Sequence, residues 1–343
     1  MLDTRVKDWT TEPHGAAVEL TYSTLWRTFG VFLILAAAIW LSLYAISKSF
    51  PFVQNGATAI AEEKQILALN PHMFAPGDKI RVIAFGNSKT LAGFRPSVFS
   101  SQVGSESSAE NLAIPGDSRF LDLLETALTH GAAPTHVFLQ TLPLPEDEAD
   151  RSQSPWNYFL DNKKMVKLLF PFRPFIRDAI IFAFESRSAG SLTAQYRSNA
   201  SQIEKMREER GYYFIKSQSH YAGDRLPDGY SLPTDTPNKV ATRNVDTNDP
   251  YFQRLMRLAD QYDFQIVLIP TAYRPGEFAE APPIDAESVK ALKSFPRVHV
   301  VGPAYWIYDL AEFSDPVHLN MHGAERYSKQ LAALFQGQIA ARR

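Results

Sequence analysis

Residues 79–90, KIRVIAFGNSKT, contain the pattern that decides the fold of this chain. A short apolar run with β-branched residues predicts a buried strand, and the glycine and asparagine at 86 and 87 predict a tight turn at its carboxyl end. Four further runs of this kind follow, namely ENLAI at 110–114, THVFLQT at 135–141, FQIVLIPT at 264–271 and RVHVVG at 297–302.

Helical patterns lie between these apolar runs. Between the second and third runs, residues 119–128, RFLDLLETAL, place apolar side chains at helical spacing. Five strands with intervening helices predict an α/β fold, with a three-layer, doubly wound, mostly parallel five-stranded sheet. Sheets of this kind place their functional sites at the carboxyl ends of the strands.

A second feature is the uncharged run FGVFLILAAAIWLSLYAI at residues 29–46. At about 1.5 Å per residue it is close to the length needed to cross a hydrocarbon core of about 30 Å. A cleaved signal peptide is the alternative, but the run is longer than a typical h-region and begins late. We therefore expect an uncleaved anchor at 29–47, and Arg5 and Lys7 favour a cytoplasmic N-terminus.

The rest of the chain divides around these two features. We expect a cytoplasmic tail at 1–28 and a juxtamembrane connector at 48–78, with a helix in AEEKQILALN. The α/β domain would then occupy 79–343, with a helical cap inserted at about 146–250. The cap contains MVKLLFPFRPFIRDAIIFAFES at 165–186, which suits either a buried helical face or a surface that rests on a membrane or a membrane partner. Residues 219–250 predict a long irregular loop over the site.

Composition excludes several classes of function. The net charge is -2 without long blocks of one sign, so a nucleic-acid partner is not expected. The chain has no cysteine, which excludes thiol catalysis, disulfides and thiolate metal sites.

Two segments far apart in the sequence supply candidate chemistry. Ser88 lies on the turn after the first strand, where a nucleophile would be exposed. A serine hydroxyl needs a histidine to take its proton, and the histidine needs an acceptor that fixes its tautomer. His318 and Asp315, three residues apart in FSDPVHLN, provide both and predict a Ser88, His318, Asp315 triad. A metal at Asp315, His318 and His322 is less favoured, and no cofactor is expected.

These motifs resemble the blocks of SGNH (GDSL-like) hydrolases, with the SGNH/flavodoxin-like fold. The resemblance rests on Gly-Asn-Ser at 86–88, on Asn111 and Gly116 in NLAIPG, and on Asp-x-x-His-Leu-Asn at 315–320. It implies an oxyanion hole formed by the backbone N–H groups of Ser88 and Gly116. The family's third block, Gly-x-Asn-Asp, is missing after the third strand.

Several polar residues are weaker candidates for the same site. Gln140 is a candidate replacement for the missing oxyanion donor, although a strand-end polar residue is the simpler interpretation. Asn87 either orients the oxyanion or serves the turn. Asn111, together with Tyr273 and Arg274 at the end of the fourth strand, is a candidate contact for substrate.

The departure from the family pattern is similar to membrane-anchored branches of the family, such as the alginate O-acetylation proteins and the D-alanine transfer protein of teichoic acids. This resemblance implies a single-pass protein of the bacterial inner membrane with a periplasmic catalytic domain. It would act beside a membrane-bound O-acyltransferase and acylate, most simply acetylate, an exported polysaccharide in exopolysaccharide biosynthesis. An esterase or deacetylase with the same triad, and a non-catalytic subunit of a polysaccharide modification or export complex, remain alternatives.

Overall fold

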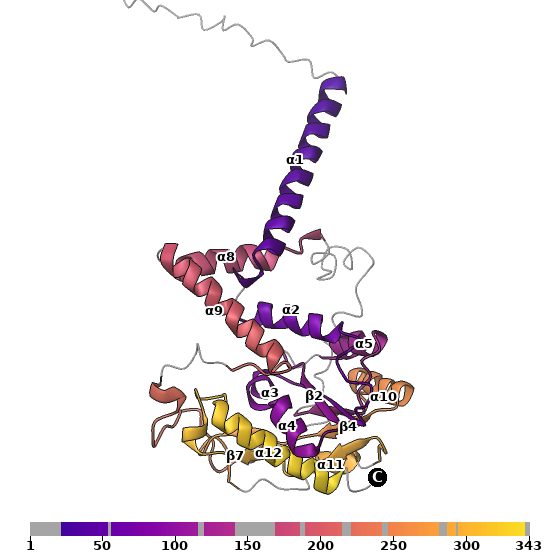
Figure 1. Ribbon diagram of the computed structural model, residues 1–343, viewed down its shortest axis with the longest axis vertical. Helices are drawn as coiled ribbons and strands as arrows, with labels where there is room; N and C mark the ends of the chain where they lie inside the picture. Colours follow the sequence, from indigo (N-terminus) through magenta and orange to yellow (C-terminus); the bar gives the residue numbers. More distant parts are fainter. Residues whose placement is uncertain are drawn as a thin grey trace, which may run out of the picture. The chain divides into compact units, whose positions relative to one another are not determined.

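The computed structural model shows how the helices and strands are arranged (Figure 1). It describes residues 22–53, 56–115, 120–140, 169–185, 189–214, 221–241, 246–280, 287–292 and 294–339. The chain divides into two compact units, Met1–Phe50 and Pro51–Arg343.

The first unit contains α1, Tyr22–Ser49, a helix of 28 residues. Its apolar window has a mean hydropathy of 2.3, and none of that window is buried. At about 1.5 Å per residue the helix is long enough to cross a bilayer. The prediction of one N-terminal helix that is long and apolar enough to span a membrane is confirmed.

The second unit is built on a five-stranded parallel sheet, which confirms the α/β prediction. The strands lie in the order β2-β1-β3-β4-β6, so the chain steps outward from β1 in both directions. The carboxyl ends of β1 and β3 therefore adjoin the point where the strand order reverses, which is where open α/β sheets bind ligands. The strands are β1 Ile80–Phe85, β2 Ser107–Asn111, β3 His136–Leu139, β4 Gln265–Leu268 and β6 Val298–Val300.

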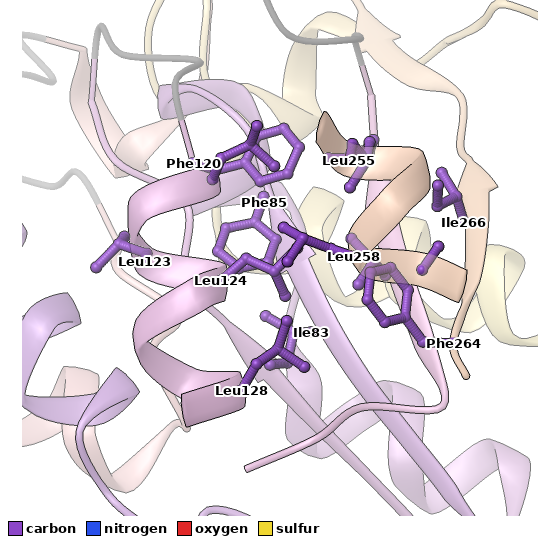
Figure 2. Close-up of a cluster of buried hydrophobic side chains, with 14 of the residues drawn as sticks. Ile83, Phe85, Phe120, Leu123, Leu124, Leu128, Leu255, Leu258, Phe264 and Ile266 are labelled. Atoms are coloured by element: carbon purple, nitrogen blue, oxygen red, sulfur yellow. The ribbon is translucent and has the colours of Figure 1, made fainter. Parts of the chain in front are cut away.

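One face of the sheet packs against α5, Leu121–Thr129, and α10, Pro250–Tyr262 (Figure 2). Alternate residues of β1, Ile83 and Phe85, point to this side, and the Phe85 ring stacks on Phe120 at 4.8 Å between centroids. This cluster of leucine and phenylalanine side chains fixes the direction of β1, and thereby the place where the strand delivers the following turn.

The opposite face packs against α4, Pro96–Val103, and α12, Met321–Gln338. Phe138 of β3 contacts the rings of Phe99 from α4 and Phe335 from α12. These two rings also contact each other, so the two helices pack together on this face of the sheet. Because both faces are covered, the three central strands β1, β3 and β4 are mostly apolar, as buried parallel strands are.

Two details differ from the prediction. β2 begins three residues earlier than the predicted run, because Ser107 and Ser108 pair with β1 although their side chains are polar. A separate two-stranded parallel sheet, β5 Thr271–Tyr273 with β7 Tyr305–Ile307, was not predicted.

The remaining elements are mostly helical. Where the structure describes the predicted insertion, at 169–185, 189–214 and 221–241, it has no strand. The first part of the predicted insertion, up to residue 168, lies outside the described part of the chain. The remaining helices are η1 Pro51–Val53, α2 Ala57–Ala68, α3 Ser88–Gly93, α8 Arg173–Glu185, α9 Ala189–Glu208, η4 Ala222–Asp224, α11 Glu287–Leu292 and η5 Leu310–Glu312.

A buried lysine joins α2 to the sheet. Lys64 is fully enclosed and donates hydrogen bonds to the carbonyls of Asn111, at 2.5 Å, and Gly211. Burial lowers the pKa of Lys64 to about 7, against the charges of Glu110 and Glu63, which raise it. The ammonium therefore sits in an interior that penalises its charge, but its hydrogen bonds connect three segments of the fold.

This burial predicts a pH dependence of stability. Between pH 7 and pH 10.5 the unfolded chain binds one proton more than the folded chain at Lys64, so the free energy of unfolding rises with pH across this range. Lys64→Met should remove that rise, which is on the order of a few kcal/mol. Urea unfolding of the full chain in detergent at several pH values measures it. Lys79→Met, at an exposed lysine paired with Glu106, is the matched control and should retain the wild-type slope.

Candidate active site

The turn after β1 presents Ser88 at the first residue of α3. Asn87 is the helix N-cap, and its side-chain Oδ1 accepts a hydrogen bond from the Lys89 backbone N–H at 2.9 Å. Gly86 has a φ of 155°, and a Cβ there would lie 2.1 Å from Thr90 Oγ1. In the Gly-Asn-Ser sequence, Gly86 thus lets the backbone pass close to Thr90, Asn87 caps α3, and Ser88 places a hydroxyl at the carboxyl end of a central strand.

The predicted acid and base lie together in the loop that precedes α12. Asp315 Oδ2 is 2.8 Å from His318 Nδ1, and Asp315 Oδ1 accepts the backbone N–H groups of Val317 at 2.7 Å and His318 at 2.8 Å. Burial raises the pKa of Asp315, but the hydrogen bond and charge of His318 and these backbone donors outweigh it and hold the pKa below its ordinary value. An ionised Asp315 requires Nδ1 to carry the proton, which leaves Nε2 of a neutral His318 as an acceptor.

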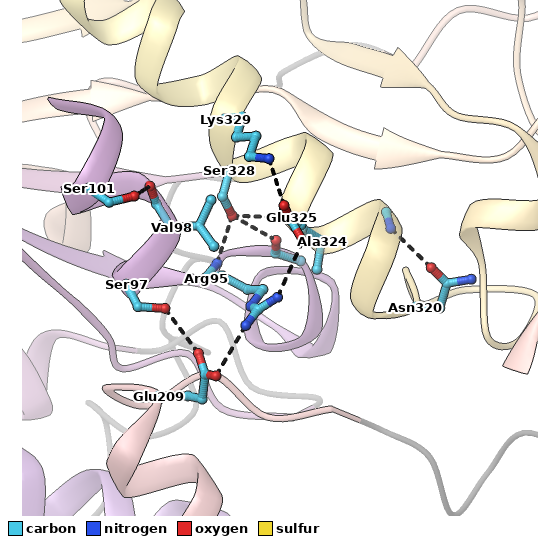
Figure 3. Close-up of polar contacts among 12 residues, drawn as sticks. Arg95, Ser97, Val98, Ser101, Glu209, Asn320, Ala324, Glu325, Ser328 and Lys329 are labelled. Atoms are coloured by element: carbon cyan, nitrogen blue, oxygen red, sulfur yellow. Dashed lines mark hydrogen bonds and ion pairs between the residues drawn. The ribbon is translucent and has the colours of Figure 1, made fainter.

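The loop itself is closed by backbone and side-chain hydrogen bonds. Ser314 N donates to the His318 carbonyl at 2.9 Å, and Phe313 and Leu319 form an antiparallel bridge. Asn320 caps α12 by accepting from Gly323 N at 3.0 Å (Figure 3). A side chain at Gly323 would place its Cβ 2.3 Å from the Glu312 carbonyl, so the glycine lets α12 begin against this loop.

The segment that follows Ser88 and α3 is bonded to α12 through Arg95 (Figure 3). The backbone N–H of Arg95, just beyond α3, donates to Ser328 Oγ of α12 at 2.8 Å. The Arg95 guanidinium pairs with Glu209 at 3.1 Å and lies 3.9 Å from Glu325 of α12. The segment that follows Ser88 and the helix that follows His318 are therefore held to one another by charge and by hydrogen bonds.

The two halves of the predicted triad lie in one region of the domain, but no hydrogen bond joins them. α3 packs against α12. Burial lowers the pKa of Lys89, and the nearby charge of Asp315 is one of the charges that oppose this lowering. His318 Nε2 is buried, and among the described residues it has no hydrogen-bond partner. The histidine and aspartate are thus paired, whereas Ser88 Oγ and His318 Nε2 are not joined by a hydrogen bond.

The predicted oxyanion donors have different outcomes. The Ser88 backbone N–H belongs to the first turn of α3, where it has no partner within the helix. Gly116 lies outside the described residues. Gln140 is buried and donates its side-chain N–H to Tyr327 Oη at 3.3 Å, and Asn87 serves as the helix cap.

The structure corrects the prediction of Asn111 as a substrate contact. Its side chain is fully buried, and Nδ2 donates to the carbonyls of Thr90 at 3.0 Å, Leu91 at 3.3 Å and Phe94 at 2.8 Å. Its Oδ1 accepts from Ala113 N at 3.1 Å. Asn111 therefore holds the carboxyl end of α3 in place and has no group left to offer a ligand.

Arg274 is also given a structural role in place of the predicted substrate contact. Its guanidinium is buried and forms a two-pronged pair with Asp235, with Nη1 donating to Oδ2 at 2.8 Å. Nε donates to the Pro316 carbonyl at 3.1 Å, inside the segment between Asp315 and His318. Arg274 thus positions the loop of the histidine and connects it to the irregular segment at 221–241.

Tyr273 stays beside the candidate site, and it reveals a neighbour that sequence reasoning missed. The Lys89 ammonium lies over the Tyr273 ring at 3.9 Å from its centroid and 3.2 Å from Glu277. Burial lowers the pKa of Lys89, and the charge and hydrogen bond of Glu277 oppose this effect. The position of Lys89 next to Ser88 is a signal visible in the sequence, whereas Glu277, 188 residues later, gave none.

The side chains near the candidate site also bear on metal binding, in the part of the chain that the structure describes. There, no group of three or more His, Asp or Glu side chains is arranged to hold a metal ion. Comparisons with protein-family models, with curated proteins and with solved structures find no match for this chain.

Proposed function

We propose that this chain is a membrane-anchored serine O-acyltransferase of the SGNH type. In this proposal it passes an acyl group, most simply acetyl, from Ser88 to a hydroxyl of an exported polysaccharide. The observation that carries the proposal is the Asp315–His318 pair, whose buried Nε2 has no partner among the described residues, in a loop beside the helix that begins with Ser88.

The proposed reaction has two transfers at one serine. His318 Nε2 takes the Ser88 hydroxyl proton while Oγ attacks the carbonyl carbon of the acyl donor, and Asp315 stabilises the resulting imidazolium. The tetrahedral oxyanion collapses, the leaving group departs with the proton from Nε2, and an acyl ester remains on Ser88. A sugar hydroxyl then gives its proton to Nε2 and attacks this ester, and Ser88 recovers its proton.

The oxyanion would be stabilised by the Ser88 backbone N–H and, by the resemblance to the SGNH blocks, by that of Gly116. Gln140 is a weaker candidate for a third donor because one of its N–H groups is engaged by Tyr327. With water in place of the sugar hydroxyl, the same steps make an esterase or deacetylase. The two functions differ in whether the acceptor site excludes water.

The proposed setting is a bacterial inner membrane with the domain in the periplasm. It is supported by the length and apolar composition of α1 and by Arg5 and Lys7 before it. The resemblance adds a membrane-bound O-acyltransferase as the source of acyl groups. Purification from detergent without any such protein would count against that partner.

The covalent step can be tested directly. The purified full chain, incubated with an activated acetyl ester, should gain the mass of one acetyl group, and Ser88→Ala should not. Ser101→Ala is the matched control and should retain the adduct, since the hydroxyl of Ser101 lies on the exposed end of α4 and bonds to the Val98 carbonyl.

An adduct that survives in Ser88→Ala would assign the acylation to another residue. No adduct, under conditions that acylate an active SGNH enzyme, would favour the non-catalytic subunit. Peptide mapping of the labelled protein separates these results from non-specific acetylation of surface lysines.

A further inference from the structure

The helix α8 is apolar on two opposite sides. One side is buried and includes Phe175, Phe182 and the polar Asp178. The other side exposes Ile176, Ile180, Ile181 and Phe184, whose exposed fractions are 39%, 54%, 43% and 78%.

We call these four residues the outer face of α8. Ile176, Ile180 and Phe184 recur every four residues and therefore line one side of the helix. A helix that is apolar all round is usually buried or in contact with lipid, and exposed apolar patches of this kind mark interaction sites. The buried side already provides the contact with the domain, so the outer face requires a separate explanation.

The contacts of α8 indicate which surface it meets. α8 and α9 both pack against η1, Pro51–Val53. The carbonyl of Phe52 accepts a hydrogen bond from Asn199 Nδ2 of α9 at 2.9 Å, and the Phe52 ring meets Tyr196 at 5.4 Å. η1 is therefore a fixed part of the domain and not a loose linker.

The chain itself limits how far η1 can lie from the end of the anchor helix. α1 ends at Ser49 and η1 begins at Pro51, so the two residues are at most about 7 Å apart along an extended chain. If α1 spans the bilayer, η1 emerges next to the membrane surface, and α8 lies within about one helix diameter, roughly 10 Å, of η1.

The charge on α8 suits the same surroundings. Arg177 follows Ile176 on the exposed part of the helix, and its side chain is 66% exposed and paired with Asp178. Arginine next to isoleucine and phenylalanine is typical of interfacial helices, because the apolar groups enter the boundary between headgroups and acyl chains while the cation stays with the phosphates.

We propose that the outer face of α8 inserts into the interfacial layer of the lipid bilayer beside the anchor. This inference rests on the proposed anchoring by α1 and goes beyond it, because it adds a second membrane contact made by the catalytic unit. Two contacts fix the orientation of the domain over the membrane, which attachment through the anchor helix alone would not do.

The absence of cysteine permits a direct test in the full chain. Single Phe184→Cys and Ile180→Cys variants carry a fluorescent label and are reconstituted into vesicles of phosphatidylcholine and phosphatidylglycerol. Nitroxide lipids then quench the label from either a shallow or a deep position of the acyl chain. Leu35→Cys, at the middle of α1, reports anchoring, and Met321→Cys, an exposed apolar position on α12, is the matched control.

Labels at 184 and 180 should lose most of their fluorescence to the shallow quencher and less to the deep one, because interfacial helices enter only about 5–10 Å. The label at 35 should respond more to the deep quencher, and the label at 321 to neither. Unchanged circular dichroism confirms that each variant is folded.

Labels at 184 and 180 that are quenched no more than the label at 321 would overturn the inference. If the label at 35 is still quenched, the anchoring proposal survives and only the contact of α8 fails. If the label at 35 is also unaffected, the anchoring itself is wrong. Labels at 184 and 180 that are shielded from aqueous iodide but not quenched by lipid would show a protein partner or a second copy on this face, which also overturns the inference.

Discussion

Replacing Asp315 by asparagine is expected to lower kcat for acyl transfer by about 10⁴-fold, the loss that this exchange causes in serine-protease triads. Asp315 accepts from His318 Nδ1 and thereby leaves Nε2 as a proton acceptor. An asparagine can keep the bonds from the Val317 and His318 backbone through its oxygen, but its NH₂ then faces Nδ1. The imidazole must turn to the other tautomer, whose Nε2 carries a proton and cannot accept one from Ser88.

The measurement is the rate of release of the leaving group from an activated acetyl ester, with wild type and Asp315→Asn compared at the same pH. Asp228→Asn makes the same change on the exposed loop at 221–241 and should retain the wild-type rate. A loss of less than about tenfold, equal to about 1.4 kcal/mol in the barrier, would contradict the assigned role of Asp315.

Replacing Arg274 by methionine is expected to reduce the free energy of unfolding by about 3–5 kcal/mol. The side chain of Asp235 is only 10% exposed, and without the guanidinium its charge has no opposite partner in that contact. Breaking one side of a buried pair costs more than removing both sides, since the remaining ion keeps its desolvation penalty. The Pro316 carbonyl also loses its donor, so the loop of His318 should become less ordered.

Urea or thermal unfolding of the full chain in detergent measures this loss. The double variant Arg274→Met/Asp235→Leu is the informative control, because removal of both charges should restore much of the stability. A single variant as stable as wild type would mean that the pair is solvated in solution. A double variant no more stable than the single one would mean that packing by Arg274, and not the ion pair, supports the loop.

The fold was predictable because its signals are local. Each central strand is a short apolar run, and the helical pattern at 119–128 became α5. The start of β2 was predicted three residues too late, because its first residues, Ser107 and Ser108, are polar and pair with β1 only in the folded sheet. The sheet of β5 and β7 was missed because each strand has three residues and pairs across a long interval of sequence.

In the candidate site, too, contacts between residues close in sequence were predictable and contacts between distant residues were not. The pairing of Asp315 with His318 was predictable, since a spacing of three residues lets one loop hold both. The pairs Arg274–Asp235 and Lys89–Glu277 join residues that are 39 and 188 positions apart, and single-sequence patterns do not carry such information. Asn111 was misassigned because a motif position does not tell where a side chain points. The link from Ser88 to His318 and the oxyanion role of Gly116 stay predictions.

The buried amide of Asn111 has a consequence for the interpretation of mutagenesis surveys. It holds three carbonyls at the end of the helix that begins with Ser88, and its own carbonyl receives Lys64. An alanine scan scored only by turnover would rank this position with the proposed triad, although the Asn111 side chain is buried and bonded within the fold. A survey of this protein should therefore pair each activity with a melting temperature, so that scaffold defects are not counted as chemistry.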